Sequence, residues 1–230
     1  MRLRALLNYK ELPILYRHKV LSLIKSALER SDKEYFESLY ASKKPRPFTF
    51  AVLVAKGSRL EGDVFYSEKP HTLWISSFDS KFKVKLYNGL LEEEYVKSIE
   101  VKAGKEIKRG EILCKSLSPI LIEREGNNPL KEENFERFNI YLYLIEENVM
   151  KALLGRGLKK ELKFEPVDWR IVVVKHTLDG IREGLGKPYA YFTCFDGYFR
   201  LSGHPEDLEF LYNKGIGLRT SQGVGMVEVL

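Results

Sequence analysis

The sequence predicts an α+β fold of two tandem ferredoxin-like (RRM-like) domains, the second of which ends in a glycine-rich loop. Three observations support this fold class. The elements expected in about the first 115 residues have the order strand–helix–strand–strand–helix–strand. The second half repeats this order less clearly. Apolar residues make up 44% of the 230 residues and charged residues 30%, which is the balance of a globular chain long enough for two domains.

In the first half, short β-branched and aromatic runs indicate strands, and apolar residues at helical spacing indicate helices. Residues 2–9 form the first expected strand, and residues 14–30 form a helix with one apolar face. A polar, basic loop follows this helix and ends in the run Lys43-Lys44-Pro45-Arg46-Pro47. The later elements are strands at 48–54 and 72–76, a helix at 81–96, and strands at 99–101 and 111–115.

The second half has the same kinds of signal in the same order. The expected elements are a strand at 120–123, a helix at 134–154, strands at 170–175 and 190–201, a helix at 204–212 and a strand at 224–230. We place the domain boundary in the break near residues 116–119. The predicted domains are therefore residues 1–116 and residues 117–230.

The composition excludes several classes of protein. Cys114 and Cys194 are the only cysteines, and no CxxC motif or His/Cys cluster is present, so we expect no disulfide framework, no metal and no cofactor. No apolar run approaches the roughly 18 residues that cross a bilayer, so no membrane association is expected. The N-terminus alternates charged and apolar residues before Pro13, whereas a signal peptide has an unbroken apolar stretch. This difference predicts a cytoplasmic protein.

Positive charge is concentrated near the N-terminus. The formal net charge is +6, and residues 1–50 contain 11 Lys or Arg against 5 Asp or Glu, so the remaining residues are neutral overall. A localised excess of this kind attracts polyanions such as nucleic acid. A solvated surface rich in Lys and Glu, common in heat-stable proteins, fits the charge equally well.

A glycine-rich segment separates the last expected helix from the last strand. Its four glycines, Gly215, Gly217, Gly223 and Gly225, permit positive φ and close backbone approach, and successive exposed N–H groups can form an anion-binding concavity. The segment is neither a Walker loop nor a dinucleotide fingerprint. Charged and hydrogen-bonding side chains suited to phosphate and sugar oxygens accompany the glycines: Lys214, Arg219, Thr220, Ser221 and Gln222.

The string GIGLRTSQGVGMVEV resembles the C-terminal signature of the CRISPR-associated Cas6 (Cas-six) endoribonucleases of the RAMP superfamily. That signature is a pair of GxG elements around a basic, polar loop, followed by a short apolar strand. Residues 13–24 (PILYRHKVLSLI) and 47–50 (PFTF) add to the resemblance, and the spacing of the three elements fits. The resemblance implies that the glycine-rich segment and Arg46 bind CRISPR repeat RNA or its precursor. Other CRISPR effector subunits and a second copy of the chain are candidate partners.

The resemblance also implies metal-independent endoribonuclease chemistry. In this family the 2′-hydroxyl of the RNA attacks the adjacent phosphorus and leaves a 2′,3′-cyclic phosphate and a 5′-hydroxyl. The reaction needs a base or orienting group for the 2′-hydroxyl, an acid for the leaving oxygen and a cation for the phosphorane charge. Family members usually place a histidine shortly before the PFTF element.

That region of this chain has no histidine, and Tyr40 stands at the expected position. A tyrosine needs a nearby cation to lower its pKa from about 10, and Lys43, Lys44 and Arg46 are candidates. Three hypotheses remain open: Tyr40 cleaves RNA together with a lysine, His18 folds back into the site, or the protein binds RNA without cutting it. A RAMP subunit of an effector complex, kept for assembly, is a further alternative.

Overall fold

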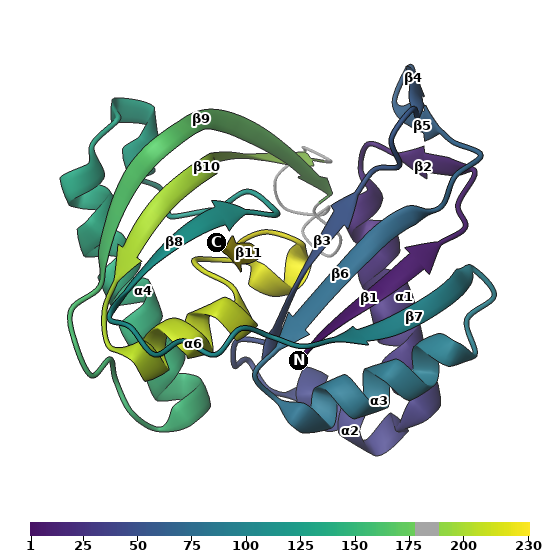
Figure 1. Cartoon of the computed structure of the whole chain (residues 1–230), viewed down its shortest axis with the longest axis horizontal. Helices are drawn as coiled ribbons and strands as arrows, with labels where there is room; N and C mark the ends of the chain where they lie inside the picture. The colour runs from purple at the N-terminus through teal and green to yellow at the C-terminus, as the bar shows by residue number, and fades with distance from the viewer. Residues whose placement is uncertain (178–188) are drawn as a thin grey trace.

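The computed structural model describes residues 1–177 and 189–230, and it contains two four-stranded antiparallel sheets in successive parts of the chain (Figure 1). Each sheet belongs to a unit with the element order strand–helix–strand–strand–helix–strand. Numbered along its own unit, each set of strands lies in the spatial order 4-1-3-2. The predicted tandem ferredoxin-like domains are therefore confirmed.

The first sheet has β1 and β6 at its centre and β3 and β7 at its edges. Apolar side chains of α1 and α3, among them Ile24 and Phe82, pack against Leu3 and Phe50 of this sheet in one buried core. The elements of this unit are β1 (Arg2–Leu7), α1 (Tyr16–Ser31), α2 (Lys33–Ala41), β3 (Phe48–Leu53), β6 (His71–Ser77), α3 (Ser80–Leu91) and β7 (Val96–Lys102).

Helix α2 corrects the expectation of a polar loop after the first helix. Asp32 begins it, because its carboxylate accepts a hydrogen bond from the N–H of Tyr35 at 2.8 Å. Tyr35, Phe36 and Leu39 form a short apolar stripe that packs partly buried against the core, and none of the helix's residues is completely buried.

A second, three-stranded sheet projects from the first domain and was not predicted. It consists of β2 (Glu11–Pro13), β4 (Arg59–Glu61) and β5 (Val64–Tyr66), with β5 in the middle. Its strands are too short for the alternation of polar and apolar residues to be visible in the sequence.

The second sheet has the order β11-β8-β10-β9. Strands β9 and β10 form a long, curved hairpin that extends toward the first domain (Figure 1). The elements of this unit are β8 (Glu111–Ser116), a 3-10 turn at Pro129–Glu132, α4 (Phe135–Leu154), β9 (Lys163–Thr177), β10 (Tyr189–Ser202), α6 (Pro205–Lys214), a 3-10 turn at Thr220–Gln222 and β11 (Val227–Val229).

Strand β8 belongs to the second sheet, where it pairs with β10 and β11. The assignment of residues 111–115 to the first unit is therefore wrong. The expected strand at 120–123 is also wrong, because Ile120 makes only an isolated bridge to Phe195 there. In the structure β8 alternates exposed and buried residues, but nothing local in its sequence shows which sheet it joins. We propose that the domain boundary lies in the connection at residues 103–110.

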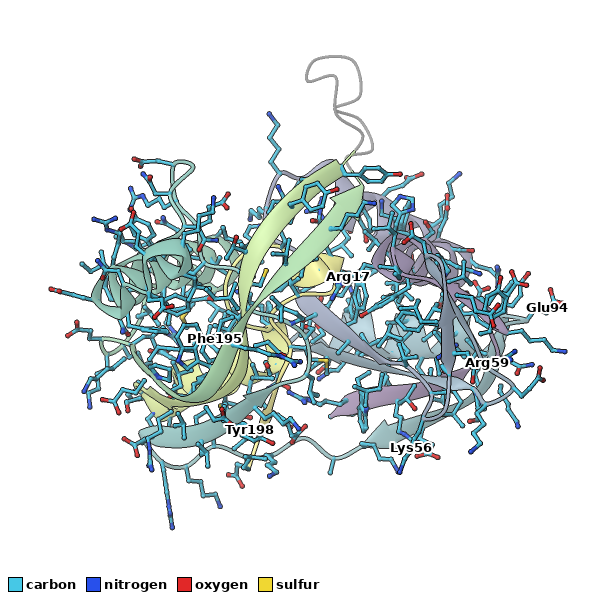
Figure 2. All side chains as sticks on the ribbon, turned by 90° about the horizontal axis from the view of Figure 1, so that it is seen from above. Arg17, Lys56, Arg59, Glu94, Phe195 and Tyr198 are labelled. Atoms are coloured by element: carbon cyan, nitrogen blue, oxygen red, sulfur yellow. The ribbon has the colours of Figure 1, made fainter. Side chains whose placement is uncertain are left out.

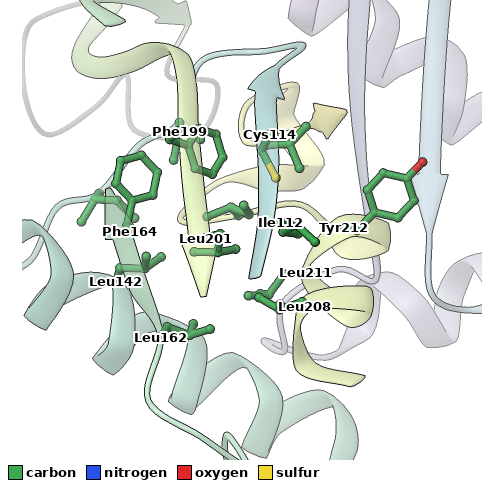
Figure 3. Close-up of a cluster of buried hydrophobic side chains, with 14 of the residues drawn as sticks. Ile112, Cys114, Leu142, Leu162, Phe164, Phe199, Leu201, Leu208, Leu211 and Tyr212 are labelled. Carbon is green, nitrogen blue, oxygen red and sulfur yellow. The ribbon is translucent and has the colours of Figure 1, made fainter. Parts of the chain in front are cut away.

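The core of the second domain is built largely of aromatic rings. The ring of Phe164 lies 4.4 Å from that of Phe199 and 5.0 Å from that of Phe195, measured between centroids. Leucines from β10, α4 and α6, together with Leu162 just before β9, surround these rings (Figure 3). This packing fixes one face of the sheet against the helices and leaves the other face toward the first domain.

Contacts between the domains are buried and specific. The guanidinium of Arg2, on β1, is 2% exposed and forms an ion pair with Glu228 at 2.9 Å. It also donates to the carbonyl oxygens of Tyr212 and Val227 and lies 3.7 Å over the Tyr212 ring. The first strand of one domain is thus tied to the last helix and strand of the other.

Within residues 1–177 and 189–230, no helix is both long and apolar enough to cross a membrane. The same residues contain no cluster of three His, Cys, Asp or Glu side chains arranged to hold a metal ion.

Candidate nucleic-acid interface

The glycine-rich segment, residues 214–226, lies between the two domains (Figure 1). A Cβ on Gly223 would lie 2.7 Å from the ring of Phe50 on β3, and the backbone there has a φ of +82°. The carbonyl of Gly223 accepts a hydrogen bond from Nε of Arg17 on α1 at 3.1 Å. Glycine is therefore required here for the segment to dock on the first domain.

A similar close contact is made at the start of the segment. A Cβ on Gly215 would lie 2.8 Å from the side chain of Thr49, and Oγ1 of Thr49 donates to the carbonyl of Val224 at 3.1 Å. The segment thus joins β3 at two successive residues, Thr49 and Phe50.

Replacing Gly223 by alanine is expected to lower the free energy of unfolding by about 2–4 kcal/mol, because the added methyl group combines overpacking with a left-handed backbone. Gly155 is the matched control, since it has a φ of +71° and a Cβ added there would meet no atom within 4 Å. Gly155→Ala should cost only about 1 kcal/mol. Urea denaturation of both variants measures the difference; equal losses would show that the contact with Phe50 does not matter.

The backbone N–H groups of the four glycines donate hydrogen bonds to acceptors inside the protein. The N–H of Gly217 donates to Oε1 of Glu146 at 2.6 Å, and the N–H of Gly225 donates to the carbonyl of Pro119 at 2.7 Å. Those of Gly215 and Gly223 donate to backbone carbonyls of Leu211 and Thr220. The expectation that these four glycine amides face an anion is therefore wrong, because each already has an acceptor in the protein.

Lys214 also has a different position from the one expected. Its side chain is 1% exposed, and its Nζ lies 2.9 Å from Oε2 of Glu146, which is 0% exposed. The predicted role of Lys214 in RNA binding is contradicted by this buried ion pair. Glu146 stands on the buried face of α4, and a carboxylate on an apolar stripe is the sequence signal that points to a hidden partner.

The outer tip of the segment keeps the features expected of an RNA contact. Arg219 is exposed, its guanidinium lies 4.6 Å over the ring of Phe192 on β10, and it donates to Oε1 of Gln222 at 3.0 Å. Ser221 and Gln222 are half-buried, whereas Thr220 is buried. One cation and two polar side chains therefore reach the surface here.

Beside this tip, three depressions follow one another along β9 and β10 and share lining residues, and the first of them is too narrow to hold a water molecule. The first lies between Arg17, His18, Lys175 and His176, and the second shares Arg17 and Lys175 with it. The third shares Arg170 and Asp196 with the second and reaches Lys115 and Tyr198. We call this surface the interdomain groove, defined by Arg17, His18, Arg170, Lys175, Tyr198 and Lys115. Figure 2 labels Arg17 and Tyr198, which line opposite ends of it.

Cations along the groove lie over aromatic rings. Lys175 Nζ is 4.1 Å from the ring centroid of Tyr189, and Lys115 Nζ is 5.2 Å from that of Tyr198. Arg170 is the exception, because both its Nε and Nη2 donate to Asp196. Proteins that bind single-stranded nucleic acid combine cations for the phosphates with rings on which bases stack.

A second cluster surrounds Tyr40 at the end of α2. The guanidinium of Arg46 lies 4.9 Å from the centroid of the Tyr40 ring, and Nζ of Lys25 lies 5.1 Å from it. The Tyr40 hydroxyl is buried, and no described residue forms a hydrogen bond with it. Arg46 also donates to the carbonyls of Ser42 and Lys44, which fixes the loop beside the ring.

Burial raises the pKa of Tyr40 to about 12, and the charge of Arg46 opposes this shift without overcoming it. The expectation that nearby cations lower this pKa is therefore wrong. At neutral pH the phenol keeps its proton, so it can donate a hydrogen bond or a proton but cannot act as a base.

The other predicted catalytic residues are divided between the two clusters. Lys43 and Lys44 are exposed in the loop beside Tyr40. His18 is exposed on α1 and lines the interdomain groove, seven residues or about 10 Å along the helix from Lys25. His18 is thus not folded back onto Tyr40, but both clusters lie along α1.

Sequence reasoning missed Arg17, Lys25 and the groove residues on β9 and β10. No described carboxylate forms an ion pair with Arg17, Lys25, Lys43, Lys44 or Arg46, whereas Arg2, Arg4 and Arg30 all have acidic partners. The N-terminal excess of positive charge is the signal that pointed to this region. The spacing of Arg17 and Lys25 on one helix could have located it.

Comparisons with known proteins show which family the chain resembles. A family model described as "CRISPR associated protein Cas6, C-terminal" matches residues 100–229, and one described as "CRISPR-associated protein Cas6, N-terminal" matches residues 11–107. The CRISPR-associated endoribonuclease Cas6 of Pyrococcus furiosus is 25% identical over 235 residues, covering 95% of this chain and 84% of that protein.

Solved structures share the fold over the whole chain. One, described as an RAMP protein binding different RNA substrates, is 21% identical with a TM-score of 0.77 and covers 100% of this chain and 99% of the other. A Cas6-related protein from Pyrococcus furiosus is 19% identical with a TM-score of 0.77, covering 100% and 98%. A Cas6 product complex is 15% identical with a TM-score of 0.63, covering 100% and 99%. With its fold and both family models in agreement, this chain belongs to the CRISPR-associated Cas6 family.

Proposed function

We propose that this chain binds CRISPR repeat RNA along the interdomain groove and cleaves precursor CRISPR RNA beside Tyr40. The observation that supports this most is the row of cations over aromatic rings in the groove, joined through α1 to the cluster of Tyr40, Lys25 and Arg46. Arg17 and Lys25 are separated by about 12 Å of helix, so a short stretch of RNA can contact both. The curated relative in Pyrococcus furiosus is named an endoribonuclease.

The proposed reaction uses the RNA's own 2′-hydroxyl. Its oxygen bonds to the adjacent phosphorus, the bond from phosphorus to the 5′-oxygen breaks, and the products are a 2′,3′-cyclic phosphate and a 5′-hydroxyl. Solvent hydroxide takes the 2′ proton, and the protonated phenol of Tyr40 supplies one to the leaving oxygen. Arg46, Lys25, Lys43 and Lys44 offset the charge of the phosphorane, and in-line positioning supplies much of the rate.

The buried Tyr40 hydroxyl must be uncovered for this role. Lys25 and Arg46 lie near its ring, and a phosphate that attracts these two cations would draw them away from the phenol. RNA binding thus completes the site.

One observation favours a second candidate, in which the protein binds repeat RNA without cutting it. The Tyr40 hydroxyl is buried and its pKa is raised, so the phenol is a weak acid in the state described. Incubating the purified protein with its own repeat RNA in EDTA separates the two candidates. Cleaved RNA supports the first, and tight binding of intact RNA supports the second.

Arg219→Ala is expected to weaken repeat RNA binding about tenfold and to reduce the slope of log affinity against log salt by roughly 0.7, because one phosphate contact is lost. Fluorescence anisotropy at several salt concentrations measures both quantities. Lys131→Ala removes an exposed lysine of the second domain and serves as the control. An unchanged slope in Arg219→Ala would exclude a phosphate contact by Arg219.

A further inference from the structure

An open hollow of about 490 Å³ lies on the small sheet β2-β5-β4, away from Tyr40 and outside the interdomain groove. Its lining is rich in cations that surround one aromatic ring. Lys10, Lys56, Arg59 and Lys69 are exposed there, together with the carboxylates Glu11 and Glu68 and the half-buried Tyr66. Figure 2 labels Lys56 and Arg59 on this part of the first domain.

The four cations of the hollow outnumber its two carboxylates, Glu11 and Glu68. No described carboxylate forms an ion pair with Lys10, Lys56 or Lys69, and Arg59 meets only Glu61 at 3.8 Å with both side chains well exposed. Exposed ion pairs of this kind contribute little, so the guanidinium remains available to a stronger partner. The hollow therefore suits an anion.

Tyr66 lines the hollow between a cation and a carboxylate. On β5 it pairs directly with Arg59 of β4 on one side and with Glu11 of β2 on the other, so these three side chains share one face of the sheet. A ring on a short sheet with cations around it offers a surface for a base and charges for its phosphates.

The small sheet also adjoins the interdomain groove. Ile14 lines the groove's second depression, and its N–H donates to the carbonyl of Asp63, between β4 and β5, at 2.8 Å. Lys10 precedes Arg17 by seven residues, a span of at most about 25 Å. A strand of RNA leaving the groove past Arg17 can therefore reach this sheet.

We propose that the hollow binds a nucleotide of the single-stranded RNA that extends beyond the interdomain groove, with a base stacked on Tyr66 and phosphates beside Lys56 and Lys69. This inference rests on the proposed RNA binding in the groove. It adds a second contact that lengthens the RNA footprint without taking part in cleavage.

Three RNAs test the proposal: the minimal repeat RNA, the same RNA with eight unpaired nucleotides added at its 5′ end, and the same RNA with them added at its 3′ end. The wild-type protein should bind one extended RNA about tenfold more tightly than the minimal one, as expected for one stacked base. Tyr66→Ala should remove most of this gain and Tyr66→Phe should keep it, while the minimal RNA is bound and cut as before. Lys56→Ala and Lys69→Ala should each reduce the salt slope for the extended RNA by roughly 0.7.

Lys97→Ala, an exposed lysine on β7, is the control and should change nothing. The proposal is overturned if extension brings no gain, if Tyr66→Ala weakens binding of the minimal and extended RNAs equally, or if Tyr66→Phe loses as much as Tyr66→Ala. Wild-type protein that binds none of these RNAs would instead refute RNA binding in the groove.

Ultraviolet crosslinking to an unstructured 12-nucleotide RNA tests the position of the contact. A crosslink within residues 56–69 supports RNA binding in the hollow, and the absence of such a crosslink overturns the proposal.

Discussion

Replacing Lys214 by alanine is expected to lower the free energy of unfolding by about 3–5 kcal/mol, the usual cost of removing one partner from a buried ion pair. Glu146 is fully buried and, among the residues that the structure describes, would keep only the N–H of Gly217 as a hydrogen-bond donor. The loss should be visible as a lower urea midpoint. The same change at Lys33, whose pair with Glu37 is exposed, should cost about 0.5 kcal/mol or less.

A compensated variant separates stability from RNA binding. Lys214→Met combined with Glu146→Gln removes both charges, keeps the volumes similar and should recover most of the stability. Because Lys214 is buried, this double variant should bind repeat RNA with the wild-type affinity. Weak RNA binding by a stable double variant would mean that Lys214 contacts a phosphate of the RNA directly, as the sequence suggested.

Cleavage is expected to accelerate about tenfold for each pH unit between pH 6 and 9, without a plateau. Hydroxide removes the 2′ proton in the proposed reaction, and Tyr40 remains protonated throughout this range because burial raises its pKa to about 12. Single-turnover rates at saturating protein, corrected for spontaneous RNA hydrolysis, measure the profile. A histidine base would instead give a plateau above about pH 6.5.

Two variants test which residues determine how the cleavage rate depends on pH. Tyr40→Phe should lower the rate about a hundredfold while leaving RNA affinity unchanged, because only the proton donor is lost. His18→Ala should leave the slope unchanged, since His18 lies in the groove and not beside Tyr40. A plateau that disappears in His18→Ala would mean that His18 is the base.

Much of the fold could be predicted from the sequence because its elements have strong local patterns. The helix at 134–154 and the strands paired as β3 and β6 were found from periodicity and β-branched residues. The sheet to which β8 belongs could not be predicted, since pairing between distant strands has no local signal. Helix α2 is short, and its apolar stripe of Tyr35, Phe36 and Leu39 is only partly buried, so its pattern in the sequence was not distinguished from a loop.

The candidate site was predicted less completely. The glycine-rich segment was recognised, but its role as an amide cradle was wrong because its glycine N–H groups donate to acceptors within the protein, among them Glu146 and the carbonyl of Pro119. Which residues a glycine approaches depends on how the two domains pack, and the sequence does not show this. Arg219 remains a predicted RNA contact, while Lys214 is a structural residue.

The most direct test of the proposed activity is cleavage of repeat RNA in EDTA, with and without a 2′-hydroxyl at the nucleotide upstream of the cut. We predict a 2′,3′-cyclic phosphate and a 5′-hydroxyl from the natural RNA, and no product from RNA with a single 2′-deoxy nucleotide at that position, although both RNAs bind equally. Cleavage of the deoxy RNA, or cleavage that requires a divalent metal, would contradict the proposed mechanism.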